Sequence, residues 1–158
     1  MNELKSALRR ARPSLWSAIF SALVICLGDR ALPALLGDGK AILPGVASVF
    51  VTINAGVSFS FLSGSPALAT ALGAIALIVL AAFMPQKGLS PLCRASLGAA
   101  FSGGLCNFLS RLRFGFVRDW IHLDFMRFPV FNLADVFVCA GALVFALGLL
   151  LDQKNGNA

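Results

Sequence analysis

The chain has 158 residues, of which 58% are hydrophobic and only 13% are charged. Soluble domains carry about 25% charged residues, so this composition excludes an ordinary soluble domain and indicates a membrane protein. The formal net charge is +6, but no basic stretch is interleaved with aromatic residues that would stack on bases. We therefore expect no nucleic-acid partner.

Four apolar stretches are each close to the roughly 20 residues that cross a bilayer as a helix. They cover about residues 15–36, 66–84, 89–109 and 131–151. Helices are favoured because every backbone N–H and C=O group must find a partner without water. We predict an all-α membrane protein, with one integral membrane domain over residues 1–158 and four transmembrane helices.

The first apolar stretch follows a basic segment, as in a cleaved signal peptide. It is too long for the apolar region of a signal peptide, and no small-x-small cleavage site precedes a polar mature domain. We interpret it as a retained helix.

Basic residues also predict the orientation of the helices. One set precedes the first helix, lies between the second and third, or closes the chain: Lys5, Arg9, Arg10, Arg12, Lys87, Arg94 and Lys154. An even number of spans puts this set on one side, which is cytoplasmic by the positive-inside rule. A second set crowds the opposite side: Arg111, Arg113, Arg118 and Arg127. We interpret these arginines as kept there to meet lipid phosphates or to orient carboxylates.

The connection between the first and second helices is rich in turn and β-branched residues. Residues 37–40 read Gly-Asp-Gly-Lys, which favours a turn, and residues 42–54 are too short to span a bilayer as a helix. Gly56 permits a tight turn. We predict a small extracytoplasmic, β-like platform on the membrane surface.

Two aspartates lie where an apolar chain should avoid charge. Asp119 comes after the third stretch, and Asp135 lies near the start of the fourth. A carboxylate near hydrocarbon depth costs a few kcal/mol, which makes it a functional-site candidate. Asn132 and Asp135 are three residues apart, so they share a helical face. The alternatives are helix capping for Asp135 and an ion pair with Arg113 or Arg118 for Asp119.

The other chemical groups point to no metal and no other catalytic set. The four cysteines, Cys26, Cys93, Cys106 and Cys139, have no CxxC spacing, and His122 is the only histidine. We expect free thiols that pack as small apolar groups, and no metal or cofactor. No Ser/His/Asp set is available, so a pair of aspartates is the catalytic scheme that this sequence supports, with one base for water and one acid for the leaving amine.

Four short motifs follow one another in a fixed order relative to the spans. They are Asn54/Gly56/Phe59 after the first helix, Asn107/Arg111 ending the third, Val117/Asp119/Trp120 next, and Phe131/Asn132/Ala134/Asp135 opening the fourth. Together they resemble the lipoprotein signal peptidase (signal peptidase II) family of bacterial intramembrane aspartic proteases, over nearly the whole chain.

The resemblance implies roles for particular residues. Asp119 and Asp135 would be the catalytic pair. Four residues would line the site and bind substrate: Asn54, Asn107, Arg111 and Asn132. Four others would support it: Asp29, Gly56, Ser110 and Ala134.

The resemblance also implies a substrate and a location. The family cleaves prolipoproteins on the amino side of a cysteine that carries diacylglycerol, and globomycin blocks it. We expect a multi-pass protein of the bacterial cytoplasmic membrane, surrounded by membrane lipids, with both termini cytoplasmic and the site toward the outer face. A monomer is expected, because the four helices can bury their polar faces against one another.

Three departures from the family pattern keep alternatives open. Ser110 stands where the family usually has an aspartate, Pro33 stands where it tends to have a lysine, and residues 119–135 form a shorter stretch than usual. Ser110 and Pro33 suggest one alternative, a degenerate, non-catalytic protein of the same fold that binds lipidated peptides. Another is a small transporter or proton-relay subunit, although no inverted repeat is visible.

Overall fold

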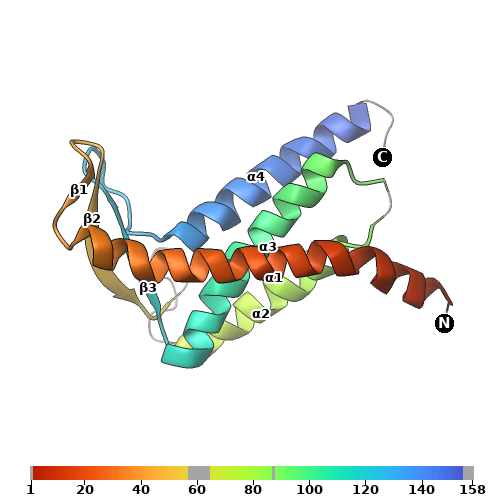
Figure 1. The fold of residues 1–158 in the computed structure, drawn as a ribbon, viewed down its shortest axis with the longest axis horizontal. Helices are drawn as coiled ribbons and strands as arrows, with labels where there is room; N and C mark the ends of the chain where they lie inside the picture. The colour runs from red at the N-terminus through yellow and green to blue at the C-terminus, as the bar shows by residue number, and fades with distance from the viewer. Residues whose placement is uncertain (1, 57–64, 87, 155–158) are drawn as a thin grey trace.

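The computed structural model describes residues 2–56, 65–86 and 88–154, with side chains described over 16–56, 65–86 and 88–151. Four helices and a small sheet make up this part of the chain (Figure 1). In chain order they are α1 (Asn2–Leu36), β1 (Ala41–Leu43), β2 (Ala47–Asn54), α2 (Pro66–Phe83), α3 (Pro91–Phe114), β3 (Val117–Leu123) and α4 (Leu133–Lys154). Each predicted apolar stretch overlaps one of these helices. Phe59 of the first motif lies outside the described residues.

Three helices are long and apolar enough to cross a membrane, over Trp16–Leu36 in α1, Pro66–Phe83 in α2 and Leu133–Leu151 in α4. Large apolar side chains cover their outer faces; examples are Phe20, Leu23, Leu27, Ile75, Ile78, Leu143 and Leu150, which are all more than half exposed. An apolar surface of this extent is unfavourable in water and favourable in lipid. The chain is an integral membrane protein, mostly helical, with a three-stranded sheet.

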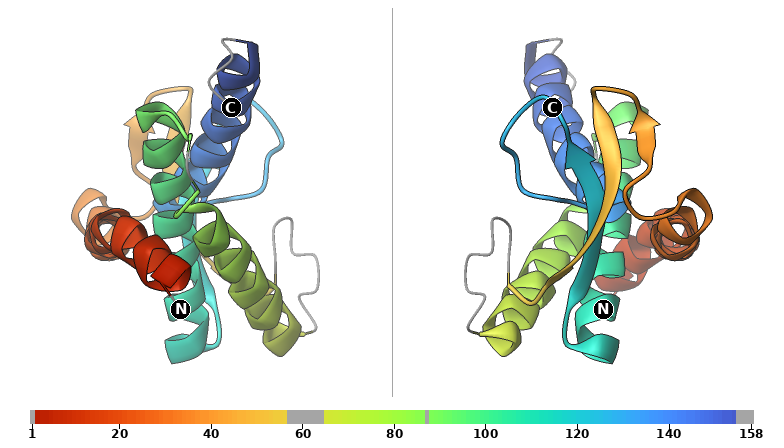
Figure 2. Two further views of the ribbon diagram at one scale, coloured as in Figure 1. Left: turned by 90° about the vertical axis from the view of Figure 1, so that its right-hand side faces the viewer. Right: turned by 90° about the vertical axis from the view of Figure 1, so that its left-hand side faces the viewer.

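Helix α3 is the centre of the bundle and contacts α1, α2 and α4 (Figure 2). Small residues let α4 approach it closely. A Cβ atom added at Gly141 would lie 2.5 Å from the Ala100 nitrogen and 2.6 Å from the Ser96 carbonyl oxygen, and one added at Gly103 would overlap the Ala134 carbonyl oxygen. The α3–α4 interface is therefore backbone against backbone at these two positions.

A disulfide joins α1 to α3, between Cys26 and Cys106, whose Cα atoms are 5.4 Å apart. The prediction of four free thiols is wrong for this pair. The two residues are 80 positions apart in different helices, so no local spacing in the sequence indicated their contact. Neither Cys93, which is buried, nor Cys139, which is exposed, is in a disulfide.

The sheet has the antiparallel order β1-β2-β3 and lies at the opposite end of the bundle from both chain termini (Figure 1). Strands β1 and β2 come from the predicted platform region. Strand β3 comes from the connection between α3 and α4, where we predicted no strand. It pairs with β2 so that Asp119 is opposite Thr52 and Val117 is opposite Asn54. This pairing brings the end of β2 next to Asp119.

We expect Gly141→Ala to destabilise the protein, because the new methyl group would overlap the backbone of α3. The cost should be about 1–3 kcal/mol, as for other overpacked interiors, and thermal unfolding in detergent would measure it. Gly98→Ala is the matched control, since a Cβ at Gly98 in α3 meets nothing within 4 Å. An equal loss of stability in both variants would contradict the close α3–α4 packing.

Cysteine labelling tests the disulfide. After denaturation without reductant, a polyethylene-glycol maleimide should add to two of the four cysteines, and after reduction it should add to all four. Cys26→Ser, which retains three cysteines, should label equally with and without reductant. Four labels on the unreduced wild-type protein would show that α1 and α3 are not linked.

Candidate active site

Asp119 is buried in β3, with 2% of its surface exposed, and both of its carboxylate oxygens accept hydrogen bonds. The Asn54 side-chain N–H donates to Oδ2 at 2.9 Å, and the Asn132 side-chain N–H donates to Oδ1 at 2.7 Å. Asn54 is the last residue of β2, and Asn132 directly precedes α4. Three segments that are distant in the sequence therefore meet at this carboxylate.

Asp135 lies in the first turn of α4 and is half-buried. The Asn107 side-chain N–H donates to its Oδ1 at 2.7 Å, and the Asn132 backbone N–H donates to its Oδ2 at 3.2 Å. In return, the Asp135 backbone N–H donates to the Asn132 side-chain oxygen at 2.8 Å. This reciprocal pair is a capping box. The capping alternative considered for Asp135 thus describes one of its contacts, and the bond to Asn107 is additional.

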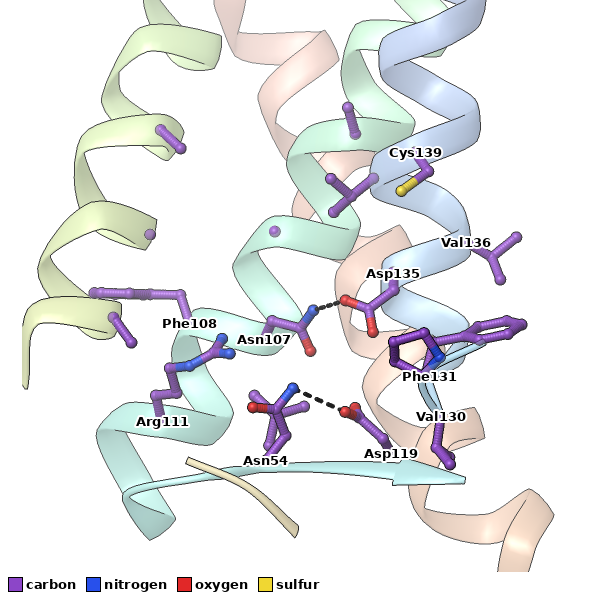
Figure 3. Close-up of a pocket in the computed structure, with 18 of the residues that line it drawn as sticks. Asn54, Asn107, Phe108, Arg111, Asp119, Val130, Phe131, Asp135, Val136 and Cys139 are labelled. Carbon is purple, nitrogen blue, oxygen red and sulfur yellow. Dashed lines mark hydrogen bonds between the residues drawn. The ribbon is translucent and has the colours of Figure 1, made fainter. Parts of the chain in front are cut away.

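Asn132 connects the two carboxylates. Its side-chain N–H groups donate to Asp119 and, at 3.2 Å, to the Asn107 side-chain oxygen, while Asn107 donates to Asp135. Figure 3 shows the side chains of Asp119, on β3, and Asp135, on α4, near one another, with Asn54 and Asn107 beside them. Amide side chains can act as both donor and acceptor, and a continuous chain of hydrogen bonds results.

Arg111 approaches this network from α3. One terminal N–H of its guanidinium donates to the Gly56 carbonyl oxygen at 2.6 Å, and the Gly56 N–H donates to the Asn54 side-chain oxygen at 3.0 Å. Its Nε is buried and has no partner among the described residues. No ion pair within 4 Å joins Arg111 to a described carboxylate, so its charge acts on the pair at longer range.

Burial dominates the chemistry of Asp119. Loss of water raises the pKa of this carboxyl to about 6, and the charge of Asp135 also raises it. The hydrogen bonds from Asn54 and Asn132 and the charge of Arg111 lower the pKa, without cancelling the effect of burial. Asp119 is therefore able to hold or release a proton near neutral pH.

Asp29, near the end of α1, holds the segments that carry the two carboxylates. It is 8% exposed, and its Oδ1 accepts the Trp120 indole N–H at 2.8 Å and the Leu133 backbone N–H at 2.7 Å. Its Oδ2 accepts the Ala134 backbone N–H at 3.0 Å. Asp29 thus binds β3 next to Asp119 and the start of α4 next to Asp135, and it does not line the large cavity described next.

A cavity of about 620 Å³ opens beside Asp119 and Asp135. We call it the large cavity. Asn54, Asn107 and Arg111 also line its polar end (Figure 3). The rest of its wall is apolar and comes mainly from α2, α3 and α4, including Ala69, Gly73, Leu77, Leu80, Phe108, Val136 and Val138. The α2 residues were not predicted to line a cavity, because their small and apolar side chains look like those of an ordinary membrane helix.

The remaining predicted residues lie apart from the large cavity. Asn132 and Ala134 are buried at the α4 start, where the Ala134 carbonyl faces Gly103. Ser110 lines a separate cavity of about 70 Å³, which we call the small cavity. Pro33 is buried in α1. In the part of the chain that the structure describes, no three His, Cys, Asp or Glu side chains converge as metal ligands would.

The chain is similar to known proteins in sequence and in fold. The family model described as signal peptidase (SPase) II matches residues 21–151. The lipoprotein signal peptidase of Lactococcus lactis subsp. cremoris (strain SK11) is 37% identical over 120 residues, which cover 76% of this chain and 80% of that protein. The lipoprotein signal peptidase of Streptococcus agalactiae serotype Ia is 34% identical over 123 residues, with 77% and 80% covered.

A solved structure also matches the fold. A bacterial membrane enzyme determined by the in meso method at 2.3 Å resolution superposes with a TM-score of 0.75, covering 89% of this chain and 92% of that chain. The two sequences are 24% identical. This likeness concerns the arrangement of the helices and the sheet.

The effect of Asp135 on Asp119 is testable by titration. Because the Asp135 charge adds to the effect of burial on the pKa of Asp119, Asp135→Asn should lower that pKa from about 6, while burial should still keep it above the usual value near 4. The ¹³C shift of the Asp119 carboxyl, assigned with Asp119→Asn, would report it. Asp124→Asn removes an exposed carboxylate on the sheet and should leave the titration unchanged. A wild-type midpoint below 4 would contradict the effect of burial.

Proposed function

The chain belongs to the signal peptidase II family, and we propose from this premise that it removes signal peptides from diacylglyceryl-modified prolipoproteins, on the amino side of the lipidated cysteine. The observation that carries the proposal is the position of Asp119 and Asp135 at the polar end of the large, mostly apolar cavity. Such a cavity suits a substrate that is partly peptide and partly lipid.

The proposed chemistry is aspartic peptide hydrolysis by the carboxylate pair, Asp119 and Asp135. One carboxylate takes a proton from water, and the water oxygen forms a bond to the scissile carbonyl carbon. The other carboxyl gives its proton to the leaving nitrogen as the C–N bond breaks. Two neighbouring carboxylates share one proton readily because both cannot ionise without repulsion. The pKa of about 6 for Asp119 supports this sharing near neutral pH.

Arg111 and the asparagines are proposed to position substrate. The Arg111 Nε is buried without a partner, and an unpaired buried donor is costly unless a ligand occupies it. A backbone carbonyl of the bound peptide would provide the missing acceptor. Asn54 and Asn107 line the cavity and hold the two carboxylates, so they fix the direction in which the carboxylates face the substrate.

The apolar wall of the large cavity is proposed to take the lipid and the signal-peptide side chains. Its volume of about 620 Å³ is in the usual range for ligand pockets. Small residues on α2, such as Ala69, Gly73 and Ala76, leave room in the wall next to α3. Membrane lipids and lipidated prolipoproteins are therefore the proposed partners, with the protein acting as a monomer.

We also propose the topology. The single domain would have four membrane spans, with α3 as the fourth span beside the three apolar helices. Both termini lie at the end of the bundle opposite the sheet. In the predicted orientation, the first set of basic residues is on the same side of the membrane as the termini. By the positive-inside rule, the termini would be cytoplasmic and the sheet would lie on the outer face of the bacterial cytoplasmic membrane.

The alternative is a non-catalytic relative that binds lipidated peptides, and it was motivated by Ser110 and Pro33. Ser110 lines the small cavity rather than the large one. The absence of a carboxylate at position 110 therefore leaves the wall of the large cavity, which faces Asp119 and Asp135, unchanged. This location supports the enzyme over the degenerate binder.

A gel-shift cleavage assay with a diacylglyceryl-modified prolipoprotein tests the proposal. Wild type should cleave the substrate, and Asp119→Asn and Asp135→Asn should each lose at least about 100-fold in rate, as expected when one member of an acid–base pair is removed. Both variants should still bind substrate. Asp124→Asn, which removes an exposed carboxylate on the sheet, is the matched control and should cleave normally.

Ser110→Asp extends the same assay. Equal cleavage by wild type and Ser110→Asp would show that serine is tolerated at this position. Cleavage by Ser110→Asp alone would mark a chain disabled at one position. Substrate binding without cleavage by wild type and by every variant would refute the peptidase and leave the lipopeptide binder.

A further inference from the structure

Three arginines gather where α1, α3 and β3 meet, away from the large cavity. The guanidinium carbon of Arg30 lies 4.3 Å from the centre of the Phe114 ring, and that of Arg113 lies 5.3 Å from the same centre. Arg118 lines the small cavity together with Arg30 and Phe114. The cation–π contacts hold two of these charges in place. Three positively charged side chains therefore lie close together beside the small cavity.

No carboxylate neutralises this group by direct contact. Within the described residues, the single contact within 4 Å between a basic and an acidic side chain joins His122 of β3 to Asp124, directly after that strand. Asp29 also lines the small cavity, but its two oxygens are occupied by three N–H donors from Trp120, Leu133 and Ala134. The positive charge of the arginines therefore exceeds the negative charge that faces them.

The small cavity is large enough for a small anion. Its volume is about 70 Å³, several times the roughly 10–15 Å³ that admits one water molecule. Besides the arginines it offers the Ser110 hydroxyl, which is a further hydrogen-bond donor. Arg30 and Arg118 are exposed, so the cavity is accessible from outside the bundle.

We propose that the small cavity binds a phosphate-type oxyanion, held by the guanidinium groups of Arg30 and Arg118 and by the Ser110 hydroxyl. Guanidinium groups match phosphate oxygens in charge and in geometry. The phosphate belongs either to a lipid headgroup or to free inorganic phosphate, which present the same chemistry. Asn107 and Asn132 line the small cavity and also donate hydrogen bonds to Asp135 and Asp119. They therefore separate the anion from the carboxylate pair, and the bound anion would help to hold these two asparagines in place.

The site also explains how the chain accommodates serine at position 110. A carboxylate here would face Arg30 and Arg118 across the small cavity and neutralise them. Serine removes that negative charge but retains a hydroxyl donor, and a bound oxyanion restores the charge balance. The proposal concerns binding alone and does not depend on whether the carboxylate pair cleaves a peptide bond.

Thermal unfolding of the full chain in a neutral detergent tests the proposal. The added probes are sodium phosphate and dihexanoyl-phosphatidylglycerol, each compared with sodium chloride at the same ionic strength. A bound anion should raise the unfolding temperature by a few degrees at saturating concentration. A rise with sodium phosphate identifies a site for the free anion, and a rise with the lipid alone identifies a headgroup site. No rise with either probe overturns the proposal.

Variants locate the effect. Arg30→Gln and Arg118→Gln should lose most of the rise, whereas Arg127→Gln, which removes an exposed arginine outside the small cavity, should retain it. An equal rise in all three variants would overturn the proposal. If the Arg30 and Arg118 variants fail to fold, Ser110→Asp decides. Its new carboxylate should occupy the anion's position and abolish the response, and an undiminished response would refute the site.

Discussion

The burial of carboxylates is the constraint on which the rest of the structure depends. A carboxylate removed from water costs several kcal/mol unless N–H donors surround it, and this chain buries Asp29 and Asp119 and half-buries Asp135. Every donor to these groups comes from a segment distant in the sequence or from the start of α4. Asp29 binds β3 and α4, Asp119 binds β2 and the residue before α4, and Asp135 binds α3. Satisfying the carboxylates therefore assembles the bundle and the sheet around them.

The kind of donor matters as much as the number. Asp119 accepts hydrogen bonds from two neutral amides, and no guanidinium lies within ion-pair distance of it in the described part of the chain. A direct salt bridge to arginine would hold the pKa of this carboxyl low, and the group would then stay ionised throughout the neutral range. Amides stabilise the charged form less strongly, so burial prevails and the pKa rises to about 6. The same network fixes the position of Asp119 and leaves its proton exchangeable.

The sequence predicted the elements whose signal is local. Long apolar stretches indicated the helices, and the Asn-x-x-Asp spacing of Asn132 and Asp135 indicated a shared helical face, which the capping box now describes. Features that depend on distant pairing were missed. Strand β3 forms because β2 lies beside it, Cys26 meets Cys106 across 80 positions, and the α2 residues line a cavity only because of where α2 packs. None of these contacts leaves a period or a spacing in the chain, so none could be predicted from the sequence.

Helix α3 shows how packing and polarity are balanced in this fold. It is not among the three helices apolar enough to be recognised as spans by composition, because it is rich in small residues and contains Arg94, Arg111 and Arg113. It packs against the other three helices. Its small residues permit close approach, and Gly103 lies four positions before Asn107, on the same face. Gly103 contacts the Ala134 carbonyl, directly before Asp135. The close packing at Gly103 thus sets how near Asn107 comes to Asp135, which is 2.7 Å between Nδ2 and Oδ1. A helix with larger, more apolar residues would cross the bilayer more readily, but it would hold the asparagine too far away to bind the carboxylate.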